Sequence, residues 1–111
     1  MKRIVRFDEA LEQIPNPDGK RFAVVFNHGS LDVELYAPRG HDPQQPHTRD
    51  EVYIVKSGSG TYVNGDKRDS FGPGDFLFAE AGIVHRFEDF TDDLAVWVLF
   101  YGPEGGEMGT A

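Results

Sequence analysis

The chain has 111 residues, of which 39% are hydrophobic and 13% aromatic, and this size and composition predict a single globular domain over residues 1–111. Its formal net charge of −8 disfavours nucleic acid and anionic membranes as partners, because their phosphates would be repelled, and the absence of cysteine excludes disulfides, thiolate metal sites and a cysteine nucleophile. With no signal-peptide pattern and no stretch near the roughly 20 apolar residues of a membrane span, we expect a cytoplasmic protein.

The chain begins with a segment, residues 8–14, that predicts one short helix, with Asp8 as its N-cap and Pro15 at its end. After residue 20 the sequence changes to short apolar runs separated by Gly, Pro, Asn and Asp, which is typical of strands and turns. The expected strands are residues 21–26, 30–37, 50–58, 60–64, 75–80, 84–90 and 94–102. Seven strands and one helix predict an antiparallel sandwich or barrel with a core at about 20–102 and a frayed Gly-rich tail at about 103–111.

Three patterns within these strands carry more specific predictions. Residues 31–35 alternate between apolar and acidic side chains, which predicts a half-buried strand, and Asn64-Gly65 favours a hairpin. Residues 52–55 and 94–101 are apolar on both faces, so that both faces of these strands must be covered. In a one-domain sandwich the outer face then needs a partner, and we expect a homodimer.

A group of possible metal ligands lies in the segment PQQPHTRDE, residues 43–51. Gln45, His47 and Glu51 are separated by even numbers, so they share a face if the chain is extended. His85, just before another apolar strand, is the best third strong ligand. Two histidines and one carboxylate leave open positions on Fe(II) and similar ions. Gln45 is then a weak fourth ligand or orients a bound water, and Gln44 replaces it if a bulge shifts the register.

These assignments compete with ordinary structural roles. Glu51 could instead lie exposed at the strand end and pair with Arg49 or Arg86. The other polar residues of these segments are expected at the surface, as solvated loop residues or a surface charge: His28, His41 and Asp50.

Two segments resemble the conserved motifs of the cupin superfamily. Residues 40–60 are similar to the first motif, in which a His-x-His pair precedes a glutamate and then a glycine, here Glu51 and Gly58. Residues 74–85 are similar to the second motif, in which Gly-Asp precedes Pro-x-Gly-x-x-His. The resemblance implies an all-β, double-stranded β-helix fold, an antiparallel jelly-roll barrel.

The resemblance also implies a metal site. His47, Glu51 and His85 fall on the usual ligand positions, which implies one divalent ion per chain, either Fe, Mn, Ni or Zn. The sequence departs from the motifs at Gln45, where a histidine is usual, and at Glu80, where a proline is usual. The first departure weakens one ligand position without removing the site.

The expected function is that of a small metalloenzyme of the dioxygenase, isomerase or lyase type, with a small organic ligand in the barrel. Glu51 is a candidate proton acceptor, and Tyr53 or Glu80 could assist it. Tyr53 and Phe87 share parity with the ligands of their strands and are expected to line the pocket, together with Trp97. The alternatives are a cupin that only binds or senses a ligand or metal, and a metal-free structural cupin.

Overall fold

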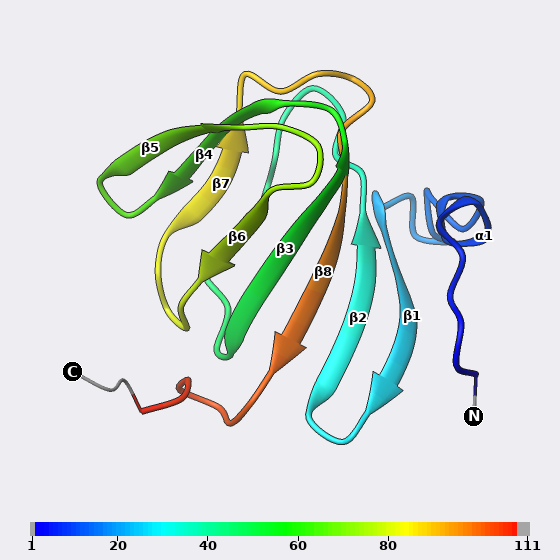
Figure 1. Ribbon diagram of the computed structural model, residues 1–111, viewed down its shortest axis with the longest axis horizontal. Helices are drawn as coiled ribbons and strands as arrows, with labels where there is room; N and C mark the ends of the chain where they lie inside the picture. Colours follow the sequence, from blue (N-terminus) through cyan, green and yellow to red (C-terminus); the bar gives the residue numbers. More distant parts are fainter. Residues whose placement is uncertain (1, 109–111) are drawn as a thin grey trace.

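The computed structural model describes residues 2–108, which form eight antiparallel strands and one short helix (Figure 1). The elements are α1 (Phe7–Leu11), β1 (Phe22–His28), β2 (Leu31–Tyr36), β3 (Asp50–Ser57), β4 (Gly60–Asn64), β5 (Lys67–Phe71), β6 (Phe76–Ala79), β7 (His85–Glu88) and β8 (Ala95–Tyr101). The predicted all-β jelly-roll architecture with a short N-terminal helix is confirmed.

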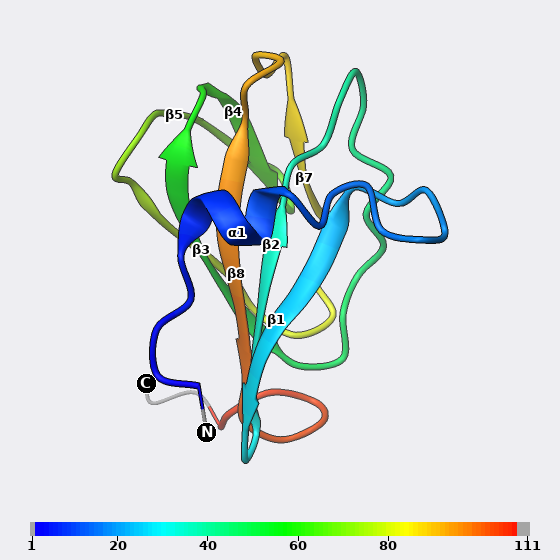
Figure 2. The same cartoon turned by 90° about the vertical axis from the view of Figure 1, so that its right-hand side faces the viewer.

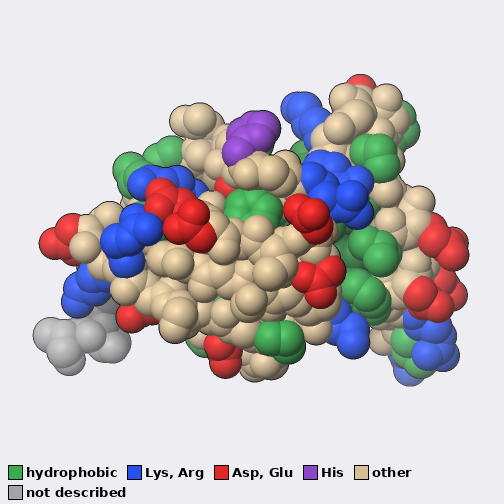
Figure 3. Space-filling model, turned by 90° about the horizontal axis from the view of Figure 1, so that it is seen from above, with side chains coloured by type: hydrophobic (Ala, Val, Ile, Leu, Met, Phe, Trp, Pro, Cys, Tyr) green, Lys and Arg blue, Asp and Glu red, His purple; other side chains and the backbone are tan. Residues whose placement is uncertain are grey.

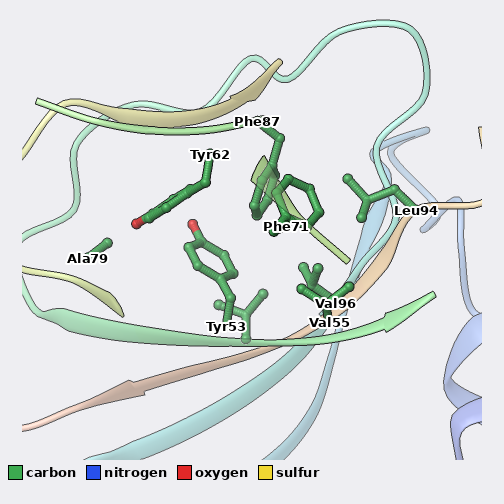
Figure 4. Packing of buried hydrophobic residues seen from close by; sticks show 9 residues of the cluster. Tyr53, Val55, Tyr62, Phe71, Ala79, Phe87, Leu94 and Val96 are labelled. Atoms are coloured by element: carbon green, nitrogen blue, oxygen red, sulfur yellow. The ribbon is translucent and has the colours of Figure 1, made fainter. Parts of the chain in front are cut away.

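The strands form two sheets that face one another. The larger sheet has the order β1-β2-β8-β3-β6 and the smaller one the order β5-β4-β7. Figure 4 shows how side chains from both sheets meet in the core between them, where they exclude water. The buried cluster comprises Tyr53, Val55, Tyr62, Phe71, Ala79, Phe87, Leu94, Val96 and Val98.

The helix α1 is shorter than the predicted segment 8–14. It begins after Arg6 and ends at Leu11, and the amides of Gln13 and Ile14 bond three residues back in a tighter turn. Asp8 lies inside the first turn, so it is not the N-cap. Within residues 2–108, no helix has the length and apolar character needed to cross a membrane.

The strand β5 was not predicted, because it lacks the alternation that identifies a half-buried strand. Four of its five residues are exposed and only Phe71 is buried. The predicted Asn64-Gly65 hairpin nevertheless forms and pairs β5 with β4, with Asn64 opposite Lys67. Gly65 has φ 61°, a left-handed conformation that the tight turn requires and glycine adopts without cost.

The alternating strand β2 turns its polar face toward the interior of the barrel. Glu34 pairs with Val98 and Tyr36 with Val96, and both valines are buried in the core between the sheets. Leu35, on the apolar face, is fully buried on the other side. Two acidic positions of a strand that alternates cleanly in sequence therefore lie on the inner side.

The segment after β8 is anchored, in contrast to the predicted frayed tail. The amide of Gly105 donates to the Thr48 carbonyl, and the amide of Glu107 donates to the Asp50 carboxylate. Asp50, predicted as a surface charge, is only 5% exposed and also accepts from the Ala81 amide. A buried carboxylate needs such donors, which fixes the segment through residue 107. Residues 109–111 lie outside the described part of the chain.

Candidate metal centre

His47, Glu51 and His85 come together as the sequence predicts. Each offers one ligand atom, and these atoms all lie within 4.8 Å of one another. Glu51 Oε1 is 3.0 Å from His85 Nε2 and 3.7 Å from His47 Nε2. His47 comes from the loop before β3, Glu51 from β3 and His85 from the start of β7, so the site joins the two sheets.

Two buried atoms of this group have no hydrogen-bond partner: Glu51 Oε1 and His85 Nε2. His85 Nδ1 lies 3.0 Å from the Ile83 carbonyl and donates to it, so Nε2 faces the carboxylate with its lone pair when the ring is neutral. A buried lone pair and a buried carboxylate repel one another unless a cation lies between them or the ring takes a second proton. The donor set, two imidazole nitrogens and a carboxylate, suits a divalent transition metal.

The surroundings shift the pKa values of the two histidines in opposite directions. Burial is the largest influence on His85 and lowers its pKa, but the adjacent Glu51 carboxylate and the Ile83 carbonyl outweigh it, and the net pKa is raised. Burial lowers the pKa of His47, with a smaller opposing influence from Glu51. His47 is therefore neutral and ready to act as a ligand at neutral pH, and the edge of its ring packs against Phe100.

The alternative role for Glu51, an exposed carboxylate paired with an arginine, is wrong. Its side chain is 1% exposed. Arg49 instead pairs with Asp32, and Arg86 pairs with Glu88. Both arginines are thus neutralised by other acids, and Glu51 is left to the two histidines.

The structure places Gln44, rather than Gln45, toward the interior. Gln45 is exposed, whereas Gln44 is partly buried and accepts a 2.6 Å hydrogen bond from the Tyr53 hydroxyl. The chain between Asp42 and His47 is not a regular strand, so even spacing does not fix its side-chain directions. Gln44 occupies the inward position that a shifted register would give it, and ligation by Gln45 stays a prediction.

Asp42 holds this loop in place. Its Oδ1 accepts from the Tyr36 hydroxyl, and its Oδ2 accepts from Gln44 Nε2 and from the Phe87 amide, both near 2.8 Å. The loop that carries His47 is thereby attached to β2 and β7. Sequence analysis did not identify Asp42, because nothing in a Gly-His-Asp-Pro turn distinguishes an anchored aspartate from a solvated one.

A cavity of about 760 Å³ adjoins the three ligands, a volume that suits a small organic molecule. It lies between the strands β1, β2 and β8 and the loop of residues 38–49, which crosses the open side of the barrel beside β1 (Figure 2). Its lining comprises Gly19, Lys20, Arg21, Phe22, Glu34, Tyr36, Pro38, Arg39, His41, Pro43, Gln44, His47, Thr48, Arg49, Glu51, Val98 and Phe100.

The three residues predicted to line the pocket lie elsewhere. Phe87 packs in the core, where its ring contacts that of Tyr53 at a centroid distance of 5.0 Å. Tyr53 is itself fully buried; its hydroxyl bonds Gln44 at the cavity wall, and its ring lies 6.0 Å from that of His85. Trp97 lies on the outer face of β8 against Phe7 of α1. The part of the interior that the small sheet covers is filled by aromatic rings, so the cavity lies beside that core.

Glu34 is the cavity residue that sequence analysis missed. It is partly buried on the inner face of β2, and its pKa is raised to about 7, first by burial and then by the charges of Glu51 and Asp32. It therefore exchanges a proton near neutral pH. The only signal in the sequence was the alternation of residues 31–35, which does not say which face is inside.

Comparison with known proteins defines the class. Residues 32–101 match the family described as Cupin domain, so the chain belongs to the cupin family. An uncharacterised protein of Streptomyces coelicolor is 33% identical over 101 residues, which cover 89% of this chain and 95% of that protein.

Solved structures agree with this fold. A cupin-2 domain protein from Shewanella frigidimarina has a TM-score of 0.69 at 14% identity, covering 89% of this chain and 95% of its own. A double-stranded β-helix protein from Klebsiella pneumoniae has a TM-score of 0.71 at 21% identity, covering 91% and 90%. At such identities the likeness shows the fold alone.

Proposed function

We propose that this cupin binds one divalent metal ion through His47, Glu51 and His85 and is a metalloenzyme for a small organic substrate. The observation that carries the proposal is the pair of buried, unpartnered ligand atoms on Glu51 and His85, which lie beside His47 at one end of a 760 Å³ cavity. Unpartnered buried polar atoms are costly, and a bound cation removes that cost.

A bound metal would supply a Lewis acid or a redox centre, which suits oxygenase, isomerase or lyase chemistry. The chain's own residues supply the rest of the site. Phe22, Val98 and Phe100 give the cavity apolar walls that displace water from a bound carbon skeleton. Glu34 can accept or donate a proton near neutral pH. The Tyr53 hydroxyl keeps its proton, because burial raises its pKa, and it holds Gln44 at the cavity wall.

The first test is metal content. Wild-type protein, purified without a histidine tag and reconstituted with Fe(II), Mn(II), Ni(II) or Zn(II), should retain about one ion per chain after desalting. His47→Ala/His85→Ala should retain none. His28→Ala is the control, because it removes an exposed histidine outside the cavity and should bind like wild type. No retained metal in wild type would contradict the proposed site.

The second test separates an enzyme from a binding module. Metal-loaded protein is assayed with enediols, phenols, keto acids and flavonoids. The proposal expects turnover that a chelator abolishes, that metal restores, and that His47→Ala/His85→Ala lacks. Saturable binding of one of these compounds without any product would instead identify a binding or sensing cupin.

A further inference from the structure

Three cationic side chains line the cavity without a carboxylate partner: Lys20, Arg21 and Arg39. Within residues 2–108, every Lys or Arg ion pair closer than 4.0 Å involves other residues. The chain has 19 Asp and Glu against 11 Lys and Arg, so acidic partners are abundant. Only four of the eleven Lys and Arg form ion pairs within the described residues, so what distinguishes Lys20, Arg21 and Arg39 is that they gather on one cavity.

Two of these cations are held close together. The Arg21 Nε donates a 2.9 Å hydrogen bond to the Ala37 carbonyl, which fixes the guanidinium beside the segment that carries Arg39. Burial and then the charge of Arg39 lower the pKa of Arg21. Like charges held together repel one another, and a bound anion would relieve that repulsion. By contrast, Arg49 lines the same cavity but is already paired with Asp32.

The cavity is also polarised along its length. Glu51 lies at the end of β3 that faces Phe100, whereas Arg39 follows β2 by three residues beyond Tyr36. Asp32 shares the cross-strand row of Phe100 and Glu51, and Tyr36 is four residues farther along β2. At about 3.3 Å per residue the two rows are roughly 13 Å apart. The metal-binding groups thus occupy one end and the unpaired cations the other, where Phe22 lies beside Tyr36, and Glu34 and Val98 form the row between them.

Figure 3 shows the end of the barrel at which β1 begins and β2 ends, where basic side chains lie among acidic ones at the surface. We propose that Lys20, Arg21 and Arg39 bind the carboxylate of a small organic acid, whose carbon skeleton extends along the apolar walls toward the three proposed ligands. Arginine suits this role, because its planar guanidinium donates two parallel hydrogen bonds to a carboxylate. The binding of the carboxylate does not depend on the proposed metal site. Only the placement of the other end of the acid, facing the three proposed ligands, rests on the proposed function.

The test compares glutarate with its uncharged diamide, glutaramide, by NMR titration of chelator-treated protein. Wild type should bind glutarate at least tenfold more tightly than glutaramide, and high salt should reduce this preference. Arg21→Gln/Arg39→Gln should reduce the preference to less than twofold. Arg3→Gln/Lys67→Gln removes the same charge at exposed positions outside the cavity and should keep the wild-type preference.

Several outcomes would overturn the inference: equal binding of the two probes to wild type, no binding of glutarate, or an equal loss of preference in the control variant. If the double arginine variant fails to fold, Lys20→Gln provides a second test, because Lys20 is exposed and its replacement should not disturb the fold. This variant should weaken the binding of glutarate but not that of glutaramide. The same titration on His47→Ala/His85→Ala separates the two proposals. A preserved preference for glutarate there, with no metal in wild type, would contradict the metal site and leave the carboxylate site standing.

Discussion

Glu34 is a carboxylate on the inner side of a barrel, and its proton is coupled to the stability of the fold. Its ordinary pKa of 4.5 is raised to about 7 by burial and by the charges of Glu51 and Asp32. The folded protein therefore binds this proton more tightly than the unfolded chain does. Folding stability that depends on Glu34 is fully present below pH 4.5 and is lost as the pH rises from 4.5 through about 7.

We predict that Glu34→Gln removes this loss. The difference in free energy of unfolding between Glu34→Gln and chelator-treated wild type should shift in favour of the variant between pH 5 and pH 8. Urea denaturation at a series of pH values measures it. Glu104→Gln removes an exposed carboxylate and serves as the control. A constant difference between Glu34→Gln and wild type across this range would show that Glu34 is not perturbed.

At the scale of single residues, the sequence was informative where two independent patterns coincided. His47, Glu51 and His85 fit both a ligand set and the cupin motifs, and the structure brings them together. The direction of the Gln45 side chain could not be inferred from even spacing, because that inference holds only for a regular strand, which the loop does not form. Asp42 and Glu34 could not be found either, since their roles depend on contacts with segments distant in the sequence.

The turn between β3 and β4 depends on Gly58, the last glycine of the first cupin-like motif. Its φ is 83°, and a Cβ built there would lie 2.5 Å from the Leu94 Cα and 2.8 Å from the Leu94 amide nitrogen. Both neighbours are backbone atoms, which cannot move aside as a flexible side chain can. The strand β3 that carries Glu51 ends directly before this turn.

We predict that Gly58→Ala lowers the free energy of unfolding by about 2–5 kcal/mol, combining left-handed strain with overpacking. Thermal and urea denaturation measure the loss. Gly72→Ala is the matched control, because no atom lies within 4 Å of its added Cβ and its φ is not positive. Equal stabilities of the two variants would show that the turn relaxes.

The loop of residues 38–49 is the second element on which the site depends. We predict that Asp42→Ala, which removes the acceptor of three donors, lowers the free energy of unfolding by about 2–4 kcal/mol. Affinity for metal should fall about tenfold, because His47 lies on this loop. Urea denaturation and metal titration measure the two effects. Asp69→Ala, at an exposed position of β5, should change neither, and unaltered metal affinity in Asp42→Ala would show that His47 is positioned independently.

At the scale of elements, the alternation of apolar and polar residues identified most strands. It did not show how exposed each strand is or which of its faces points into the barrel. The strand β5 carries polar residues on both faces and so gave no signal. For β2, the alternation fixed which residues share a face, while the loop that covers the inner side decided that the acidic face lies inside. That decision depends on tertiary packing, which no local pattern contains.

At the scale of the whole molecule, large aromatic side chains lie exposed on the outer face of the larger sheet. Phe76 and Phe78 on its edge strand β6 are 63% and 40% exposed, and they pair with Ile54 and Val52 on β3. Large exposed aromatic side chains on one sheet face are typical of an interface. This arrangement agrees with the two-sided apolar runs from which a homodimer is expected.

We predict that the protein is a homodimer in solution and that Phe76→Lys/Phe78→Lys is monomeric. Light scattering after size-exclusion chromatography measures the molecular mass of each. Val24→Lys, an exposed position of β1 at the opposite edge of the sheet, should remain dimeric. A monomeric wild type would contradict this prediction, and dimeric Phe76→Lys/Phe78→Lys would place the interface elsewhere.

The overall architecture could be predicted well because many weak signals agreed, from turn residues to strand spacing and the two cupin-like motifs. The reversed strand β2 has a practical consequence for protein engineering. A library that varies positions judged harmless because they look like surface charges would, at Glu34, change the interior of the cavity. Changes at Glu34 alter charge and volume around a ligand, while the apolar side of the same strand, including Leu35, continues to hold the fold. Selection for new ligand specificity can begin there.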